Sequence, residues 1–211
     1  MAQVEFKMMQ TIDTSVIEML TESVWSYREY TKDETTRKRF VNMDVLYGLV
    51  ESSYIEVAYV DGEAVGLLMG KVKGESRFLK RLPYRFKLWW RMVSLLMNRS
   101  HAAYGIEAMR AIDRVYKQML KKSKPFDSEV TLFVMHPKAQ GQGVGKQLMN
   151  RFLTHIKTKD ASNVFLFTDS DCTYQFYDRY GFERLQSKTI TFKLPEGKKS
   201  LDVYIYQMGL K

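Results

Sequence analysis

A loop of closely spaced glycines could hold a phosphate. Gly141, Gly143 and Gly145 follow an apolar strand that ends at His136-Pro137, and they lead directly into an amphipathic helix. Glycines let backbone N–H groups point inward without side-chain obstruction, and the first helical turn adds free N–H groups and the positive end of the helix dipole. A pyrophosphate would fit this cradle.

Two well-known phosphate-binding loops do not match this stretch. A dinucleotide-binding loop requires Gly or Ala at the position of Lys146, and a Walker loop requires Gly at the position of Gln140 and Ser or Thr at that of Gln147. The glycines therefore indicate a different class of phosphate site, or a glycine-rich turn that holds no ligand.

Other residue patterns exclude several classes of protein. The single cysteine, Cys172, cannot form an internal disulfide, and with His101, His136 and His155 it gives no zinc-ligand spacing, so we expect no metal site. The N-terminus lacks the basic and apolar regions of a secretory signal, and no stretch of about eighteen residues is apolar and uncharged. The sequence therefore predicts a cytoplasmic protein.

Composition predicts an ordinary globular protein with one unusual segment. The chain has 211 residues, of which 45% are hydrophobic and 27% are charged, so it is long enough and apolar enough to bury a core. The net charge is +9, and residues 74–127 contain 13 basic and 4 acidic residues. The whole excess of positive charge therefore lies in this segment.

The elements that must position the glycine loop alternate between strand and helix patterns. Asp61-Gly62 predicts a hairpin turn, Gly181 is typical of a helix C-cap, and Pro195-Glu196-Gly197 predicts another turn. Strand patterns cover residues 4–8, 55–60, 64–72, 130–135, 164–168, 182–192 and 201–209. Helix patterns cover residues 17–27, 40–50, 109–119, 143–157 and 173–180. These patterns predict a mixed α/β fold.

Two separated motifs, in this order, resemble the GNAT superfamily of acetyl-CoA-dependent N-acyltransferases. Residues 140–145, QGQGVG, resemble the family signature Q/R-x-x-G-x-G/A, and His136-Pro137 precedes them as the family's V-x-P strand end often does. Residues 176–182, FYDRYGF, resemble the family's F-Y-x-x-x-G-F segment. The resemblance is close over residues 129–186, loose over the opening strand and helices, and absent over residues 74–127.

The resemblance implies one acetyltransferase domain over residues 1–211. Its fold would be a mixed, mostly antiparallel central sheet of about seven strands flanked by helices, with residues 74–127 as a helical insertion between the third and fourth strands. Acetyl-CoA would be the co-substrate, and its acetyl group would pass to a primary amine of a small molecule or peptide by direct attack in a ternary complex. The alternative is a catalytically inactive CoA-binding sensor or interaction module that uses the basic insertion.

The resemblance also implies which residues bind CoA. Backbone N–H groups of residues 142–146 would bind the pyrophosphate, and backbone groups of Val134 and Met135 would bind the pantetheine arm and the thioester carbonyl. Ser170 and Thr173 lie in a turn where many relatives have an asparagine that contacts this arm. The full predicted set is Val134, Met135, Gln140, Gly141, Gln142, Gly143, Val144, Gly145, Lys146, Ser170 and Thr173.

Two catalytic residues are implied by the same resemblance. Tyr177 matches the family tyrosine that protonates the departing CoA thiolate, a role that a phenol can fill because it donates a proton. Glu129, eleven residues before Gln140, resembles in spacing the strand glutamate that acts as base in the histone-acetylating branch. Asp169 and Asp171 are alternatives for the base or for binding a cationic amine, unless they serve only in a turn, and ordered water is a further alternative.

Residues 74–127 are much longer than a hairpin connection requires, and three interpretations of their basic and aromatic residues stay open. In the first, the apolar residues pack the insertion on the domain or on a second subunit of a homodimer, and the basic residues are solvated. In the second, the insertion covers the acceptor site, and its cations favour an acidic acceptor or the CoA phosphates. In the third, a basic amphipathic helix lies on an anionic membrane or on nucleic acid. No RNA- or DNA-binding signature is present, so we expect no nucleic-acid partner.

Overall fold

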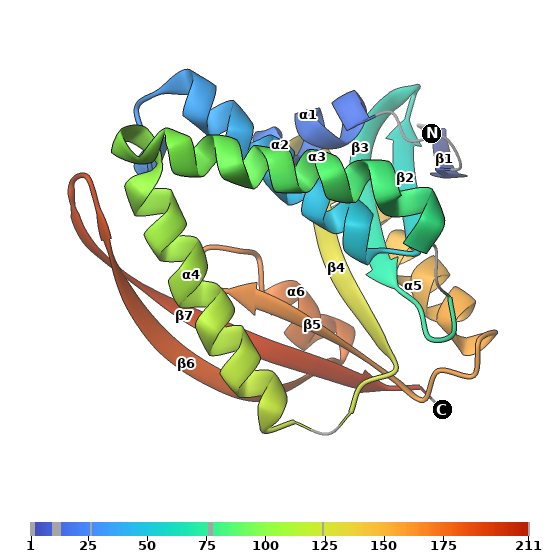
Figure 1. The fold of residues 1–211 in the computed structure, drawn as a ribbon. Coiled ribbons are helices and arrows are strands. Elements are labelled where there is room, and N and C mark those ends of the chain that lie inside the picture. Colours follow the sequence, from blue (N-terminus) through green and yellow to red (C-terminus); the bar gives the residue numbers. More distant parts are fainter. Residues whose placement is uncertain (1–2, 10–13, 26, 76–77, 124, 211) are drawn as a thin grey trace.

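The computed structural model describes residues 3–9, 14–25, 27–75, 78–123 and 125–210, with the backbone alone for residues 78–80. The predicted insertion therefore includes three positions, 76, 77 and 124, that lie outside the described residues. The elements in chain order are β1 (Val4–Met8), α1 (Thr14–Val24), η1 (Tyr27–Glu29), α2 (Glu34–Glu51), β2 (Tyr54–Val60), β3 (Glu63–Lys71), α3 (Phe78–Met97), α4 (Arg99–Lys121), β4 (Ser128–Met135), η2 (Pro137–Ala139), α5 (Val144–Lys157), β5 (Asn163–Asp169), α6 (Gln175–Tyr180), β6 (Glu183–Leu194) and β7 (Gly197–Gly209) (Figure 1).

The described strands form one seven-stranded sheet in the order β1-β2-β3-β4-β5-β7-β6. Neighbouring strands are antiparallel except β4 and β5, which are parallel. Two helices, α3 and α4, separate β3 from β4 along the chain. The predicted mixed, mostly antiparallel sheet with a helical insertion between its third and fourth strands is confirmed.

Helices cover both faces of this sheet. Successive side chains of β3 point to opposite faces of the sheet. Leu68 packs in the cluster with α5 on one face, whereas Leu67 packs in the cluster with α1 and α2 on the other. On the second face, α4 covers β5, β7 and β6, where its Met119 packs with Phe165 and Val203. One face is therefore covered by α5 and α6, and the other by α1 and α2 over one half and by α4 over the other (Figure 1).

The insertion packs on the rest of the domain through both helices. On α3, Arg81 is buried and donates a hydrogen bond to the backbone carbonyl of Leu49, and Arg91 Nε donates to Asn42 Oδ1 at 2.8 Å. On α4, Gly105 lies so close to Phe40 of α2 that an added Cβ would come within 2.3 Å of the ring. The insertion is thus part of the helical layer, as the first interpretation expects for its contact with the domain.

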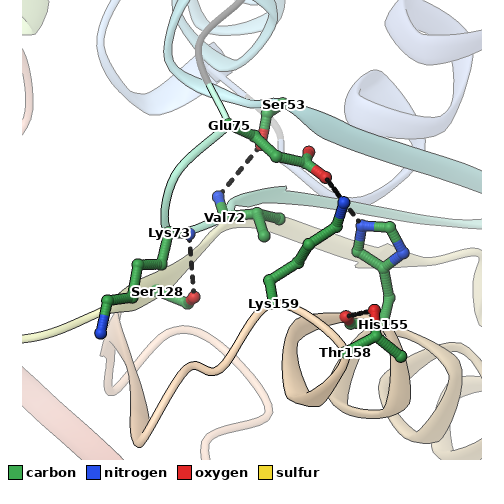
Figure 2. Close-up of polar contacts among 8 residues, drawn as sticks. All are labelled: Ser53, Val72, Lys73, Glu75, Ser128, His155, Thr158 and Lys159. Atoms are coloured by element: carbon green, nitrogen blue, oxygen red, sulfur yellow. Dashed lines mark hydrogen bonds and ion pairs between the residues drawn. The ribbon is translucent and has the colours of Figure 1, made fainter.

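Polar contacts fix the point at which the chain leaves the sheet for the insertion (Figure 2). The Val72 N–H donates to Ser53 Oγ at 3.0 Å, and the Lys73 N–H donates to Ser128 Oγ at 3.4 Å. Two residues later, Glu75 Oε1 lies 3.2 Å from Lys159 Nζ and 3.3 Å from His155 Nε2. The segment after β3 is therefore held to the residue that precedes β2, to β4 and to the end of α5.

Several element boundaries differ from the sequence-based expectation, and α2 begins at Glu34 instead of residue 40. The first helix ends at Val24, and Tyr27 lies in the separate turn η1. Leu194 pairs directly with Gly197, so the turn is Pro195-Glu196 and β7 begins at Gly197 instead of residue 201. Residues 197–200, GKKS, contain no apolar side chain, so the start of β7 lacks the apolar alternation that the expectation required.

Candidate functional site

The parallel strands β4 and β5 separate after three residue pairs. Residues 128–130 pair with residues 164–166, and then β4 continues to Met135 and β5 to Asp169 without pairing with each other. On its other side, β4 stays paired with β3 as far as Met135. Within the described part of the chain, the edge of β4 that faces β5 over residues 131–135 has no strand partner, which leaves an opening inside the sheet.

A β-bulge lies where the two strands part. Val130 pairs with Gly70 and Leu132 with Met69, so Thr131 is an extra residue on β4. A bulge bends its strand and interrupts the ladder, which accounts for the end of pairing with β5. It also fixes which side chains face α5, because Val130 and Phe133 pack on that side, although an uninterrupted strand would alternate them.

The glycine loop forms an open cradle at the end of β4. Gly141 and Gly143 have φ of +78° and +76°, a left-handed conformation that favours glycine, and an added Cβ at either would meet nothing within 4 Å. Gly143 is the N-cap of α5, and no side chain of the described residues caps this end. The free N–H groups of the first helical turn are therefore available to an anion, and the cradle fits a pyrophosphate.

Gly145 has a different function in the same motif. A Cβ at this position would lie 3.3 Å from both Met135 Cγ and Phe133 Cζ. Gly145 therefore lets α5 pack closely on the end of β4, which brings the phosphate cradle next to the opening in the sheet.

The other predicted CoA-binding residues lie around this cradle. Val134 and Val144 are buried, and Met135 is half-buried. The side chains of Gln140, Gln142 and Lys146 are exposed, and Gln142 Nε2 donates to the Lys138 carbonyl at 2.9 Å. The structure thus brings residues 134–146 together as a strand end, a loop and a helix N-terminus.

The remaining pair, Ser170 and Thr173, lies in the turn after β5. Ser170 already binds β7, since its Oγ accepts a hydrogen bond from the Asp202 N–H at 3.2 Å and its own N–H donates to the Asp202 carbonyl at 2.9 Å. Thr173 is exposed, and its carbonyl accepts from the Phe176 N–H at 3.0 Å at the start of α6. Both residues are exposed, so both hydroxyls lie at the surface of this turn.

Tyr177 lies on α6 and is only 9% exposed. Its ring contacts the rings of Phe133 and Tyr206, which places it beside β4 beyond the bulge. Burial raises the pKa of its phenol above the usual value, and the neighbouring Cys172 and Asp169 raise it further. The phenol therefore stays protonated at neutral pH, as a proton donor must.

The turn after β5 is built around Asp169. Its Oδ1 accepts hydrogen bonds from the Asp171 N–H at 3.0 Å and the Cys172 N–H at 3.2 Å, so this carboxylate fills the turn role that the sequence allowed. Burial, followed by the charge of Asp169, raises the pKa of the Cys172 thiol to about 12. The thiol is therefore neutral, and a nucleophilic cysteine is not expected here.

Glu129 lies on β4 just before the bulge and is half-buried. Burial raises its pKa to about 7, with Lys71 lowering it and Glu51 of α2 raising it. Burial raises the pKa of Tyr47 on α2, and Glu51, Glu129 and Asp113 raise it further. Glu129 is therefore on the side of α2 and α4, whereas Tyr177 belongs to the cluster on the side of α5.

The insertion contributes a tyrosine that is not among the predicted site residues. Tyr116 of α4 stacks on Phe167 with ring centroids 3.9 Å apart, and its hydroxyl is 3.5 Å from the Thr168 carbonyl. Burial raises the pKa of the Tyr116 phenol, and Asp169, Cys172 and Tyr177 raise it to smaller extents. Tyr116 therefore lies near Tyr177. Residues 74–127 lie outside the family motifs, and the helical periodicity around Tyr116 was the only signal of an inward position.

Among the described residues, no group of three or more His, Cys, Asp or Glu side chains is arranged to hold a metal ion. No helix of the described residues is both long and apolar enough to cross a membrane.

Comparison with known proteins supports the resemblance drawn from the motifs. Residues 118–193 match the family model of the acetyltransferase (GNAT) domain. Over 125 residues, 59% of this chain, the sequence is 30% identical to histone acetyltransferase TAP1 of Glycine max. The match covers 52% of that protein, so the chain spans about half the length of this curated relative.

Solved structures share the fold over nearly the whole chain. The ribosomal-protein-S18-alanine N-acetyltransferase of Escherichia coli superposes with a TM-score of 0.56 at 10% identity, covering 99% of this chain and 95% of that one. A putative acetyltransferase of Salmonella typhimurium, yncA, solved with its cofactor acetyl-CoA, gives a TM-score of 0.52 at 11% identity, covering 99% and 94%. The fold predicted from two short motifs is thereby confirmed, and the match to the acetyltransferase (GNAT) family model covers residues 118–193.

Proposed function

We propose that this chain, which carries a GNAT acetyltransferase domain, transfers the acetyl group of acetyl-CoA to a primary amine by direct attack in a ternary complex. One observation carries the proposal: the open glycine cradle lies directly beside the point where β4 and β5 separate. An extended ligand with a pyrophosphate at one end and a thioester at the other suits such an arrangement. The Salmonella typhimurium structure with acetyl-CoA has the same fold, which supports this choice of ligand.

Acetyl-CoA would be held mainly by backbone groups. The N–H groups of residues 142–146 would bind the pyrophosphate at the start of α5, where the helix dipole is positive. The unpaired edge of β4 at Val134 and Met135 would bind the pantetheine arm in the manner of an added strand. The side chains at these positions can then serve in the core, as buried Val134 does.

The chemistry needs one proton removed and one supplied. The amine nitrogen attacks the thioester carbonyl carbon, so that a C–N bond forms and the C–S bond breaks. Glu129 would accept the proton that the amine loses, directly or through water, and Tyr177 would give its proton to the departing thiolate. Their placement on opposite sides of the sheet suits an amine that enters from the side of α2 and α4.

Calorimetric titration with acetyl-CoA tests the donor site. We expect micromolar binding by the parent protein and none by Gly143→Glu, because this substitution places bulk and negative charge in the cradle. Gly62→Glu is the matched control, since Gly62 also has a positive φ, +84°, and open space around it. Failure of the folded parent to bind acetyl-CoA would overturn the proposal.

Turnover separates the enzyme from a binding module. The assay measures thiol release from acetyl-CoA with amines of different classes, namely polyamines, aminoglycosides, amino acids, a peptide N-terminus and a lysine peptide. Release with one of these amines supports the proposed reaction. Binding of acetyl-CoA without turnover on any of them would support a sensor or interaction module in its place.

A further inference from the structure

The outward face of α3 is apolar along most of its length. Large exposed fractions occur at Leu82 (52%), Phe86 (67%), Trp89 (56%), Trp90 (60%), Leu96 (42%) and Met97 (78%). The opposite side of the helix, which includes Arg81 and Leu95, is buried against α2. Folded proteins rarely expose so many large apolar side chains on one element without a partner.

Positive charge borders this apolar face. Residues 76–106 contain seven basic residues and no acidic one, and two of these basic residues, Arg85 and Lys87, are exposed on α3. Successive helical residues are about 100° apart, so Arg85 and Lys87 project on either side of Phe86. The face therefore combines an apolar centre with cationic edges. It is complementary to a partner that has anionic groups at its surface and an apolar interior.

The position of α3 leaves this face accessible along the helix. α3 packs on α2, and α2 packs on the sheet, so α3 is the outermost layer of this part of the molecule (Figure 1). The helix has 20 residues and would lie flat on a surface without any change in the sheet.

We propose that α3 binds the surface of an anionic phospholipid bilayer. The exposed tryptophan and aliphatic side chains would enter the headgroup region, where tryptophan is favoured, and Arg85 and Lys87 would contact lipid phosphates. A second copy of this chain fits the face less well. A two-fold contact places the same patch on both copies, which would bring two sets of basic residues together without acidic partners on α3.

Vesicle binding tests the proposal with the full chain. The probes are vesicles of phosphatidylcholine alone and vesicles in which about a third of the lipid is phosphatidylglycerol. Two of the three tryptophans, Trp89 and Trp90, lie on the proposed face, and Trp25 is partly buried. We expect flotation with the anionic vesicles and a blue shift of tryptophan fluorescence, both lost in about 0.5 M salt because the ionic part is screened.

Two variants separate the apolar and ionic contributions. Trp89→Ser with Trp90→Ser removes apolar area, and we expect at least tenfold weaker flotation. Arg85→Gln with Lys87→Gln removes two cations, and we expect about 25-fold weaker binding, since each cation near an anionic bilayer strengthens binding about fivefold. The matched control is Lys121→Gln with Lys122→Gln, which removes the same charge from the far end of α4 and should change binding little. Thermal unfolding checks that every variant is folded.

Three outcomes would overturn the proposal. The first is failure of the parent to bind anionic vesicles. The second is binding that both α3 variants retain at the level of the control. The third is self-association at micromolar concentration that Trp89→Ser with Trp90→Ser abolishes, because a second copy would then cover this face. Acetyl-CoA binding measured on the same samples keeps this result separate from the proposed acetyltransferase function.

Discussion

The burial of Glu129 has opposite effects on the proposed catalysis and on the stability of the fold. Its burial beside α2 raises its pKa to about 7, which suits a base at neutral pH, because such a carboxylate is both partly deprotonated and able to hold a proton. The same burial penalises the charged form and therefore lowers the stability of the folded protein when Glu129 is ionised. Activity and stability should consequently depend on pH in opposite directions.

The pH dependence of turnover follows from this pKa. If Glu129 is the base, kcat/KM rises with pH and levels off above about pH 7, since only the deprotonated carboxylate accepts a proton. Glu129→Gln should lower kcat about a hundredfold and remove this limb of the profile. Steady-state rates from pH 5.5 to about 9 measure both effects. An unchanged profile in the variant would assign the base to water or to another group.

The pH dependence of stability has the opposite sign. The folded pKa of Glu129 is about 7, above the unfolded value of about 4.3, so the folded state binds more protons between these values and stability falls as pH rises through them. Glu129→Gln carries no charge, and we expect it to be more stable than the parent by up to about 3 kcal/mol at pH 8 and equal to it near pH 4. Denaturant unfolding at the two pH values measures the difference. A constant difference would contradict the assigned pKa.

Tyr177 should affect the chemical step and leave binding unchanged. Tyr177→Phe keeps the ring contacts with Phe133 and Tyr206 and removes only the hydroxyl. We expect kcat to fall at least a hundredfold, because the thiolate loses its proton donor, while the calorimetric Kd for acetyl-CoA changes less than threefold. Tyr116→Phe is the comparison, since Tyr116 lies nearby on the insertion. Equal rates in the parent and Tyr177→Phe would exclude the assigned role.

At the scale of elements, glycines set how closely helices approach the sheet. Gly70 of β3 lies under the ring of Phe152 of α5, and an added Cβ would come within 2.4 Å of that ring and 3.0 Å of the Glu129 carbonyl. Phe152 is fully buried and cannot move away freely. Gly70 therefore holds α5 and the strand that bears the predicted base at their present separation.

Gly70→Ala tests this packing. We expect the free energy of unfolding to fall by about 1–3 kcal/mol, because the extra methyl group overpacks the site. Gly209→Ala is the control, since no atom lies within 4 Å of a Cβ there and the change should stay within about 0.5 kcal/mol. Chemical denaturation of both variants gives the comparison. Equal stability of the two would show that Phe152 accommodates the methyl group.

Local patterns allowed most elements to be predicted, whereas contacts between distant residues were not visible in the sequence. Asp61-Gly62 forms the expected turn with φ of 49° and 84°, and Gly181 ends α6 with φ of 104°. The bulge at Thr131 was missed because it depends on pairing with β3, and the apolar residues around it fit an unbroken strand equally well. The position of Tyr116 depends on how α4 crosses β5, which no short motif records. The assigned roles of the site residues stay predictions.

On the scale of the whole molecule, the two helices of the insertion have different roles. The inner side of α4 completes the core over β5, β6 and β7 and brings Tyr116 to the opening between β4 and β5. The outer side of α3 carries the exposed aromatic residues and their flanking cations. If both proposals hold, the domain would acetylate its acceptor while α3 binds a lipid surface.

The insertion also affects the order in which the sheet can fold. β3 and β4 are neighbours in the sheet, yet 56 residues lie between them, whereas turns of two residues join β2 to β3 and β6 to β7. Closing a flexible loop of that length costs about 2 kcal/mol more than closing a loop of four residues, since each doubling adds about 0.6 kcal/mol. We expect the two hairpins to form first and β4 to join after α3 and α4 have shortened the connection. Pulse-labelling hydrogen exchange would then find amides of β4 protected later than those of β2 and β7, and simultaneous protection would contradict this order.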